Sequence, residues 1–220
     1  MFPFQENGAF QLKLEELPRD ESGLVSWVQV FGVARPLRVE IGVGVSAFLI
    51  ELALRDPEFN YVGFEYSAKR VAKFLKKVET RSVNSIRVAH ADATRWLERL
   101  FIPGSVDSFY VNHPDPWPKR RHGKKRLINR QNANLLARLL RPGGRLSLRT
   151  DFAAYAHHML EILDETPNLR NVSGLGSFAQ RPLDAIVTHY EGKFLKVGQP
   201  IYYLEYVRQV SPGPDSGQAT

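Results

Sequence analysis

Residues 37–44 read Leu-Arg-Val-Glu-Ile-Gly-Val-Gly, and this stretch decides the fold. Leu37–Ile41 is a short aliphatic run of the kind that forms a buried strand. Gly42 and Gly44 supply the positive φ angles that a tight turn after the strand requires. Residues 46–55 then place apolar side chains at helical spacing and end before a proline. A strand, a glycine turn and a helix in this order predict the first unit of a parallel sheet.

The same alternation of strand and helix patterns continues along the chain. Further strands are expected over residues 61–64, 86–89, 106–111 and 145–148, and further helices over 68–78, 94–100, 127–140 and 152–163. Two last strand-like runs, Ala185–Leu195 and Ile201–Val207, are separated by too few residues for a helix, so we expect an antiparallel hairpin. The pattern predicts an α/β fold with a seven-stranded, mostly parallel sheet, a terminal antiparallel hairpin and helices on both faces.

The chain has 220 residues, which is enough for one well-buried domain and too few for two. We expect residues 1–35 to form an N-terminal arm that packs on the body, because Phe2, Phe4 and Phe10 provide apolar anchors. Residues 36–210 would form the single α/β domain. Residues 211–220 are mostly Ser, Gly, Pro and Asp, which predicts a disordered tail.

The charge distribution favours a polyanionic partner. Thirty Lys and Arg against 23 Asp and Glu give a net charge of +7. Residues 117–150 contain no acidic residue, and their densest cationic part is residues 119–126. A solvated surface run usually mixes both signs, so this segment predicts a loop that binds phosphates.

Several other classes of protein and site are excluded or disfavoured. The sequence has no cysteine, which excludes disulfides, thiolate zinc sites and cysteine nucleophiles and is compatible with a cytoplasmic location. No run of about 18 apolar residues predicts a membrane span, and no His, Asp or Glu spacing predicts a metal site. Nothing in the sequence indicates an obligate protein partner, and the oligomeric state stays open.

Five expected strands each deliver a carboxylate to the edge where ligands bind in doubly wound sheets. These acids are Glu40, Glu65, Asp92, Asp115 and Asp151. Glu65 follows the glycines by about 20 residues, where an acid can accept hydrogen bonds from ribose hydroxyls. Asp92 can accept from an adenine amino group, while the backbone N–H of Ala93 can serve the adenine ring.

These acids favour S-adenosyl-L-methionine (SAM) over a dinucleotide as the ligand. SAM joins adenine and ribose to an amino acid and a sulfonium, so nearby carboxylates are electrostatically favourable, whereas a pyrophosphate would be repelled by Glu40. The third glycine of a dinucleotide fingerprint is also missing, since Ser46 and Ala47 stand there. The acids and the terminal hairpin together predict a class I SAM-dependent methyltransferase (Rossmann-like) fold rather than a nicotinamide-binding one.

Residues 113–127, His-Pro-Asp-Pro-Trp-Pro-Lys-Arg-Arg-His-Gly-Lys-Lys-Arg-Leu, resemble the signature of the bacterial tRNA (guanine-N7)-methyltransferase family. Supporting segments occur in the same order at residues 40–44, 60–65, 86–93, 141–144, 150–151 and 188–191. The resemblance covers about Arg38 to Val207. The chain departs from the family pattern at Val45-Ser46, where another glycine or small residue is frequent, and at Asn112-His113, where Phe usually precedes the Pro-Asp-Pro motif.

The resemblance implies methyl transfer from SAM to N7 of a guanosine in the variable loop of tRNA. It implies that Glu40, Glu65, Asp92 and Asp115 line the SAM site, to which Gly42, Gly44 and Ala93 add the turn and a backbone donor. Its implied substrate contacts are Lys119, Asp151, Thr188, His189, Tyr190 and Glu191. Its implied RNA contacts are Arg121, His122, Gly123, Lys124, Lys125 and Arg126. Asp115 is the first catalytic candidate, because a carboxylate there would stabilise the cationic guanine product; Asp151 and Glu191 come second.

Three alternatives stay open on the sequence alone. The first is a SAM methyltransferase that acts on another RNA, which the basic segment fits equally well. The second is a non-catalytic RNA-binding protein with this fold, although such a protein would be expected to have lost the cofactor acids. The third is a nucleotide-dependent oxidoreductase, which the terminal hairpin and the acidic strand ends disfavour.

Overall fold

β2 (Leu37–Ile41) lies inside an eight-stranded sheet with the order β1-β4-β3-β2-β5-β6-β8-β7. The structure is a computed structural model of the chain, and it describes residues 10–181 and 185–210. The other strands are β1 (Gln11–Leu12), β3 (Asn60–Glu65), β4 (Ile86–His90), β5 (Val106–Asn112), β6 (Leu140–Thr150), β7 (Leu169–Asn171) and β8 (Tyr202–Arg208). The strands from β1 to β6 pair in parallel, whereas β8 is antiparallel to β6 and β7. The predicted α/β class and mostly parallel sheet are confirmed.

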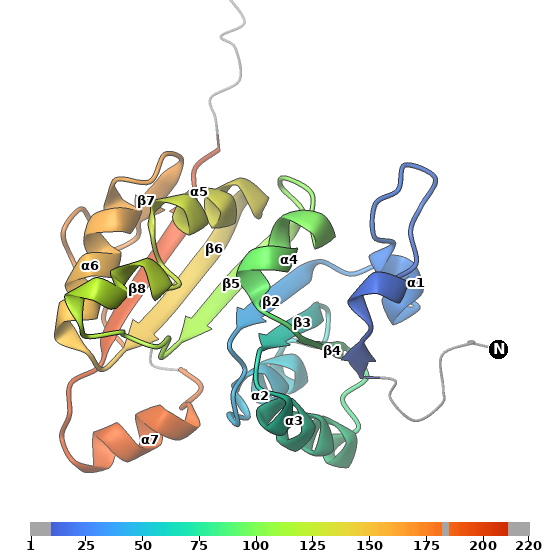
Figure 1. Ribbon diagram of the computed structural model, residues 1–220, viewed down its shortest axis with the longest axis horizontal. Coiled ribbons are helices and arrows are strands. Elements are labelled where there is room, and N and C mark those ends of the chain that lie inside the picture. Colours follow the sequence, from blue (N-terminus) through green and yellow to red (C-terminus); the bar gives the residue numbers. More distant parts are fainter. Residues whose placement is uncertain (1–9, 182–184, 211–220) are drawn as a thin grey trace, which may run out of the picture.

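The helices cover both faces of this sheet (Figure 1). They are α1 (Trp27–Phe31), α2 (Phe48–Arg55), α3 (Ala68–Arg81), α4 (Ala93–Leu100), α5 (Arg130–Leu139), α6 (Ala153–Asp164) and α7 (His189–Lys196), with short 3₁₀ helices η1 (Leu14–Glu16) and η2 (Arg120–Lys125). Helices α4, α5 and α6 share one apolar core with Val39, Phe64 and Leu148. Helices α2 and α3 share the other with Tyr61 and Ile86. In β3 and β4, the strands between these layers, buried residues are divided between the two cores, as Tyr61 and Phe64 are.

A close backbone approach holds the glycine turn against the sheet. Gly42 and Gly44 both have positive φ, at 86° and 56°. Val43 between them packs over β3 at Gly63, where an added Cβ would lie only 2.6 Å from a Val43 methyl carbon. Gly63 therefore has to lack a side chain for the turn to reach this position, directly above the end of β2.

The sheet has eight strands, not the seven that the sequence predicts. The additional strand, β1, pairs in parallel with β4 through Gln11 and Leu12. Two residues are too few to give a period-2 pattern, so this strand follows from tertiary packing and not from local sequence. Nearby, the Trp27 ring stacks on Phe101 at a centroid distance of 5.2 Å.

The antiparallel end of the sheet is confirmed, but one of its predicted strands is wrong. Residues 189–195 of the expected strand Ala185–Leu195 lie in helix α7, and β8 pairs with β6 and the short β7 instead. The cause is a capping box at the start of α7. The Glu191 N–H donates to Thr188 Oγ1 over 3.1 Å, and the Thr188 N–H donates to Glu191 Oε2 over 3.2 Å.

The basic segment 119–126 is not a simple loop, because residues 120–125 form the 3₁₀ helix η2. The predicted tail, residues 211–220, and the first nine residues of the predicted arm lie outside the described residues. Within residues 10–181 and 185–210, no helix has the length and apolar character needed to cross a bilayer. The same described ranges hold no cluster of His, Asp or Glu suited to a metal ion.

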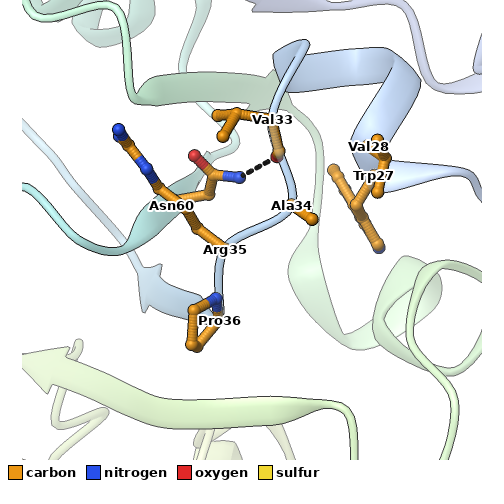
Figure 2. A pocket seen from close by; sticks show the side chains of 7 residues that line it. All are labelled: Trp27, Val28, Val33, Ala34, Arg35, Pro36 and Asn60. Carbon is orange, nitrogen blue, oxygen red and sulfur yellow. Dashed lines mark hydrogen bonds between the residues drawn. The ribbon is translucent and has the colours of Figure 1, made fainter.

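A hollow of about 260 Å³ lies at the amino ends of β2 and β3 (Figure 2). It is lined by Trp27, Val28, Val33, Ala34, Arg35, Pro36 and Asn60. Pro36 precedes β2 and Asn60 begins β3, so the hollow opens at the edge opposite the acidic strand ends. It is therefore separate from the site described next.

Candidate functional site

Glu40 is a carboxylate buried near the carboxyl end of β2, with 1% of its surface exposed. Its Oε1 accepts a hydrogen bond of 2.7 Å from the Asn112 amide of β5, and its Oε2 has no hydrogen-bond partner among the described residues. Burial raises the pKa of Glu40 to about 8, although the Asn112 hydrogen bond and the charge of Arg149 act in the opposite direction. Such a group favours a cationic ligand, whose charge would offset the cost of desolvation.

Glu65, at the end of β3, binds the backbone of the glycine turn. Its Oε2 accepts from the Gly44 N–H over 3.0 Å, and its Oε1 accepts from the Ser67 N–H over 2.9 Å. Arg70 Nη1 of α3 lies 3.8 Å from Oε1. A carboxylate has about four lone-pair sites, so Glu65 can fix the turn and still accept further hydrogen bonds.

Asp92 and Ala93 mark the start of α4 after β4. Asp92 is the N-cap of this helix, and its Oδ1 accepts from the Thr94 N–H over 3.0 Å. Its Oδ2 lies 3.8 Å from Arg95, and about half of the side chain is exposed. Ala93 is the first residue of the helix, where backbone N–H groups have no partner within the helix. The pair thus offers one acceptor and one donor side by side.

The chain after β5 contains two strained residues around Asp115. His113 and Trp117 have φ angles of 49° and 43°, a left-handed region that bulky residues seldom adopt. Asp115 between them is exposed and accepts no hydrogen bond from the described residues. Asp151, at the end of β6, is in contrast engaged, because it faces His113 Nδ1 at 3.2 Å and accepts from Gln199 at 3.0 Å.

Glu191 is fully buried and is held entirely by protein groups. Arg149 of β6 donates to its Oε2 over 2.7 Å, Arg181 donates to its Oε1 over 3.2 Å, and the Tyr203 hydroxyl also donates to Oε1. Burial opposes ionisation, but the hydrogen bond from Tyr203 and the charge of Arg149 outweigh it and lower the pKa of Glu191. The ionised pair ties α7 to β6. The side chains of His189 and Tyr190 lie outside the described part of the chain.

The basic turn η2 presents most of its cations to solvent. The exposed members are Lys119, Arg121, Lys124 and Lys125, and Gly123 lies in open surroundings. Arg126 is different, since its Nε donates to the Pro116 carbonyl over 3.0 Å and its guanidinium lies over the Tyr155 ring. Trp117 packs edge-on against His122 and under Lys125 Nζ. The contacts of Arg126 and Trp117 therefore stabilise the conformation of η2.

The structure brings the five strand-end acids to one edge, because β4, β3, β2, β5 and β6 are adjacent and parallel. It also brings in Asn112, Arg149 and Tyr203, which the sequence alone does not single out. In the sequence Arg149 is one cation of the basic segment among many, yet in the structure it is buried. Thr188 and Glu191 carried a signal for their true role, since Thr-x-x-Glu is the spacing of a capping box.

Comparison with known proteins agrees with this geometry. The family model described as "Putative methyltransferase" matches residues 34–204. A tRNA (guanine-N(7)-)-methyltransferase of Leifsonia xyli subsp. xyli is 40% identical over 184 residues, which are 84% of this chain and 81% of that protein. This chain belongs to the tRNA (guanine-N(7)-)-methyltransferase family.

Two further comparisons bear on the family and its fold. A tRNA (guanine-N(7)-)-methyltransferase of Cutibacterium acnes is 42% identical over 180 residues, which are 81% of this chain and 65% of that relative. The crystal structure of the aminoglycoside resistance methyltransferase NpmB1 superposes with a TM-score of 0.54 at 15% identity, covering 81% of this chain and 89% of that one. The fold is that of a class I SAM-dependent methyltransferase, as predicted, and SAM is the cofactor of the family.

The raised pKa of Glu40 predicts how the stability of the protein depends on pH. The folded state holds the proton up to about pH 8, whereas an unfolded Glu releases it near 4.5, so the folded state binds more protons between these values. The stabilisation is complete below about pH 4.5 and is lost as the pH rises through about 8. Urea denaturation across this range should show wild type losing on the order of a few kcal/mol relative to Glu40→Gln.

The exposed Glu58 provides a control for this experiment. Glu58→Gln should follow the wild-type pH curve. Parallel curves for wild type and Glu40→Gln would show that Glu40 does not titrate with a raised pKa.

The Glu191–Arg149 pair predicts a loss of stability when one partner is neutralised. Glu191→Gln should lower the free energy of unfolding by about 3 kcal/mol, because Arg149 would stay buried without its counter-charge. Urea denaturation measures the change, and Glu161→Gln on α6, an exposed site, should stay within about 0.5 kcal/mol of wild type. An unchanged midpoint for Glu191→Gln would mean that the ion pair does not hold α7.

Proposed function

We propose that this chain transfers the methyl group of SAM to N7 of a guanosine in the variable loop of tRNA. The observation that carries the proposal is the buried Glu40 Oε2 without a partner, beside the glycine turn at the end of β2. A buried carboxylate oxygen in this state calls for a donor, and the ammonium group of SAM is one. The names of the relatives supply the substrate class, and we infer a cytoplasmic site of action.

The strand ends fit the remaining parts of the cofactor. Glu65 would hold the ribose hydroxyls with the lone pairs that Gly44 and Ser67 leave free. Asp92 Oδ2 would accept from the adenine amino group, and the Ala93 N–H would donate to the ring. Gly42 and Gly44 leave room for the amino-acid portion. When bound, SAM supplies an electrophilic methyl group on its sulfonium.

Guanine N7 carries a free lone pair, so the protein needs no strong base to expose it. Its residues have to orient the base and stabilise the positive charge that develops on it. Asp115 suits this role best, because it is the strand-end acid that is exposed and accepts no hydrogen bond from described groups. It would accept from the Watson–Crick edge of the guanine and keep its negative charge close to the ring.

Asp151 and Glu191 would act by positioning. Asp151 holds His113, two residues before Asp115, and Gln199 in place. Glu191 orders α7 and the segment from Thr188 that precedes it. On the RNA side, Lys119, Arg121 and Lys124 are free to meet phosphates, while Arg126 keeps η2 in shape.

The reaction and its position can be tested together. Purified protein, labelled SAM and an unmodified tRNA transcript should yield N7-methylguanosine on nucleoside analysis. A transcript with the variable-loop guanosine replaced should take up no label. Label in another nucleoside would leave a methyltransferase with a different acceptor, and no label despite measured SAM binding would contradict the proposed activity.

Asp115→Asn should lower kcat by about 10²- to 10³-fold, because the amide cannot stabilise the developing positive charge on guanine. The Kd for tRNA, measured by fluorescence anisotropy, should change much less. Glu58→Gln, at the opposite edge of the sheet, is the matched control and should keep wild-type turnover. An Asp115→Asn protein with normal kcat would remove Asp115 from the catalytic role.

A further inference from the structure

The lysines of this chain are confined to a few places. It has ten lysines, and nine of them lie in residues 69–77, 119–125 and 193–196. These segments belong to α3, η2 and α7, and each borders the carboxyl ends of the parallel strands. α3 follows Glu65 at the end of β3, η2 follows β5, and α7 is tied to the end of β6. Of these three groups of lysines, the proposed function uses only the group around η2.

Helix α3 carries three of these lysines as a single stripe. Lys69, Lys73 and Lys76 follow the i, i+4, i+7 spacing that places side chains on one helix face. All three are exposed, whereas the opposite face packs into the core through Phe74 and Val78. A rise of 1.5 Å per residue spreads the stripe over about 10 Å of the helix surface.

The stripe has no counter-charge within the described part of the protein. None of the three lysines lies within ion-pair distance of a described carboxylate, and the single acid of α3 is Glu79 in its last turn. The arginines of the same helix differ, since Arg70 faces Glu65 and Arg81 faces Glu51. Like charges at i, i+3 and i, i+4 destabilise a helix slightly. The stripe therefore gains nothing from its own fold and suits an external polyanion.

Two contacts hold α3 in a defined position beside the glycine turn. Lys77 Nζ donates to the Val45 carbonyl, directly after Gly44, and Arg70 lies near Glu65. A polyanion bound along the stripe would therefore sit in a fixed place relative to the reacting groups. α3 packs on one face of the sheet, and η2 leads into α5 on the other. α3 and α5 thus cover opposite faces of the sheet (Figure 1), while α3 follows Glu65 and η2 follows β5 at its acidic edge.

We infer that Lys69, Lys73 and Lys76 form a second RNA-binding surface, which contacts the phosphate backbone of a tRNA stem next to the modified loop. The inference rests on the proposed function, because it takes tRNA as the substrate. The basic turn η2 binds the backbone on one side of the reacting guanosine, and the stripe on α3 binds it on the other. Such contacts position the RNA and carry no sequence preference.

The test compares two triple variants that remove the same charge. The first is Lys69→Gln, Lys73→Gln and Lys76→Gln together, which keeps good helix formers in α3. The control is Arg35→Gln, Arg99→Gln and Arg170→Gln together. These positions are exposed and lie before β2, in the last turn of α4 and in β7, away from the carboxyl ends of the parallel strands. The Kd for an unmodified tRNA transcript is measured by fluorescence anisotropy at several salt concentrations. SAM affinity and the urea midpoint report whether each variant is folded.

The α3 variant should bind tRNA at least tenfold more weakly at moderate salt, and the slope of log Kd against log salt should fall by about 1 for each lysine removed. The control should keep the wild-type slope. Equal slopes for both variants, with wild type binding tRNA normally, would overturn the inference and leave the proposed function intact. Equal losses in both variants would also overturn it, as an effect of net charge alone. Wild-type protein that binds no tRNA would overturn the proposed function itself.

Discussion

The constraint on which the site depends is the burial of the Glu40 carboxylate inside a parallel sheet. A charged group there loses its hydration, and among the described residues Asn112 alone donates a hydrogen bond to it. Glu40 therefore stays protonated to a higher pH than usual, unless a cation approaches its second oxygen. The glycine turn leaves open the space from which that cation can come. In the proposed function, the free energy that folding loses at Glu40 would favour binding of the cofactor.

The same edge shows how one kind of group takes several roles. Glu65 fixes the turn, Asp92 caps α4, Asp151 orients His113, and Glu191 holds α7 through Arg149. Each of these carboxylates has neighbours that satisfy at least part of it. Asp115 has none among the described residues, so its charge is available to a substrate. In the proposed function, position in the hydrogen-bond network, more than residue type, would separate the group that acts on the substrate from those that position it.

Charge is also divided by location. Five carboxylates lie at the strand ends, where the proposed function needs them, and nine of the ten lysines lie in the segments of α3, η2 and α7 that border that edge. Several arginines away from the edge are paired with acids, as Arg130 is with Glu165 and Arg138 is with Glu98. In the proposed function, an RNA backbone that approaches this surface would meet positive charge concentrated around the reacting site, which would favour productive orientation on encounter.

The sequence by itself determined the α/β class, the strand, turn and helix at residues 37–55, the five acids at one sheet edge and the membership of the family. These features follow from local periodicity, turn chemistry and a contiguous motif, all of which can be recognised in the sequence without knowledge of the fold. Tertiary structure decided that β1 joins β4, that β8 pairs with β7 and not with residues 189–196, and that Arg149 is buried against Glu191. Those outcomes depend on contacts between residues far apart in the chain, and the burial of a charge depends on what surrounds it in space.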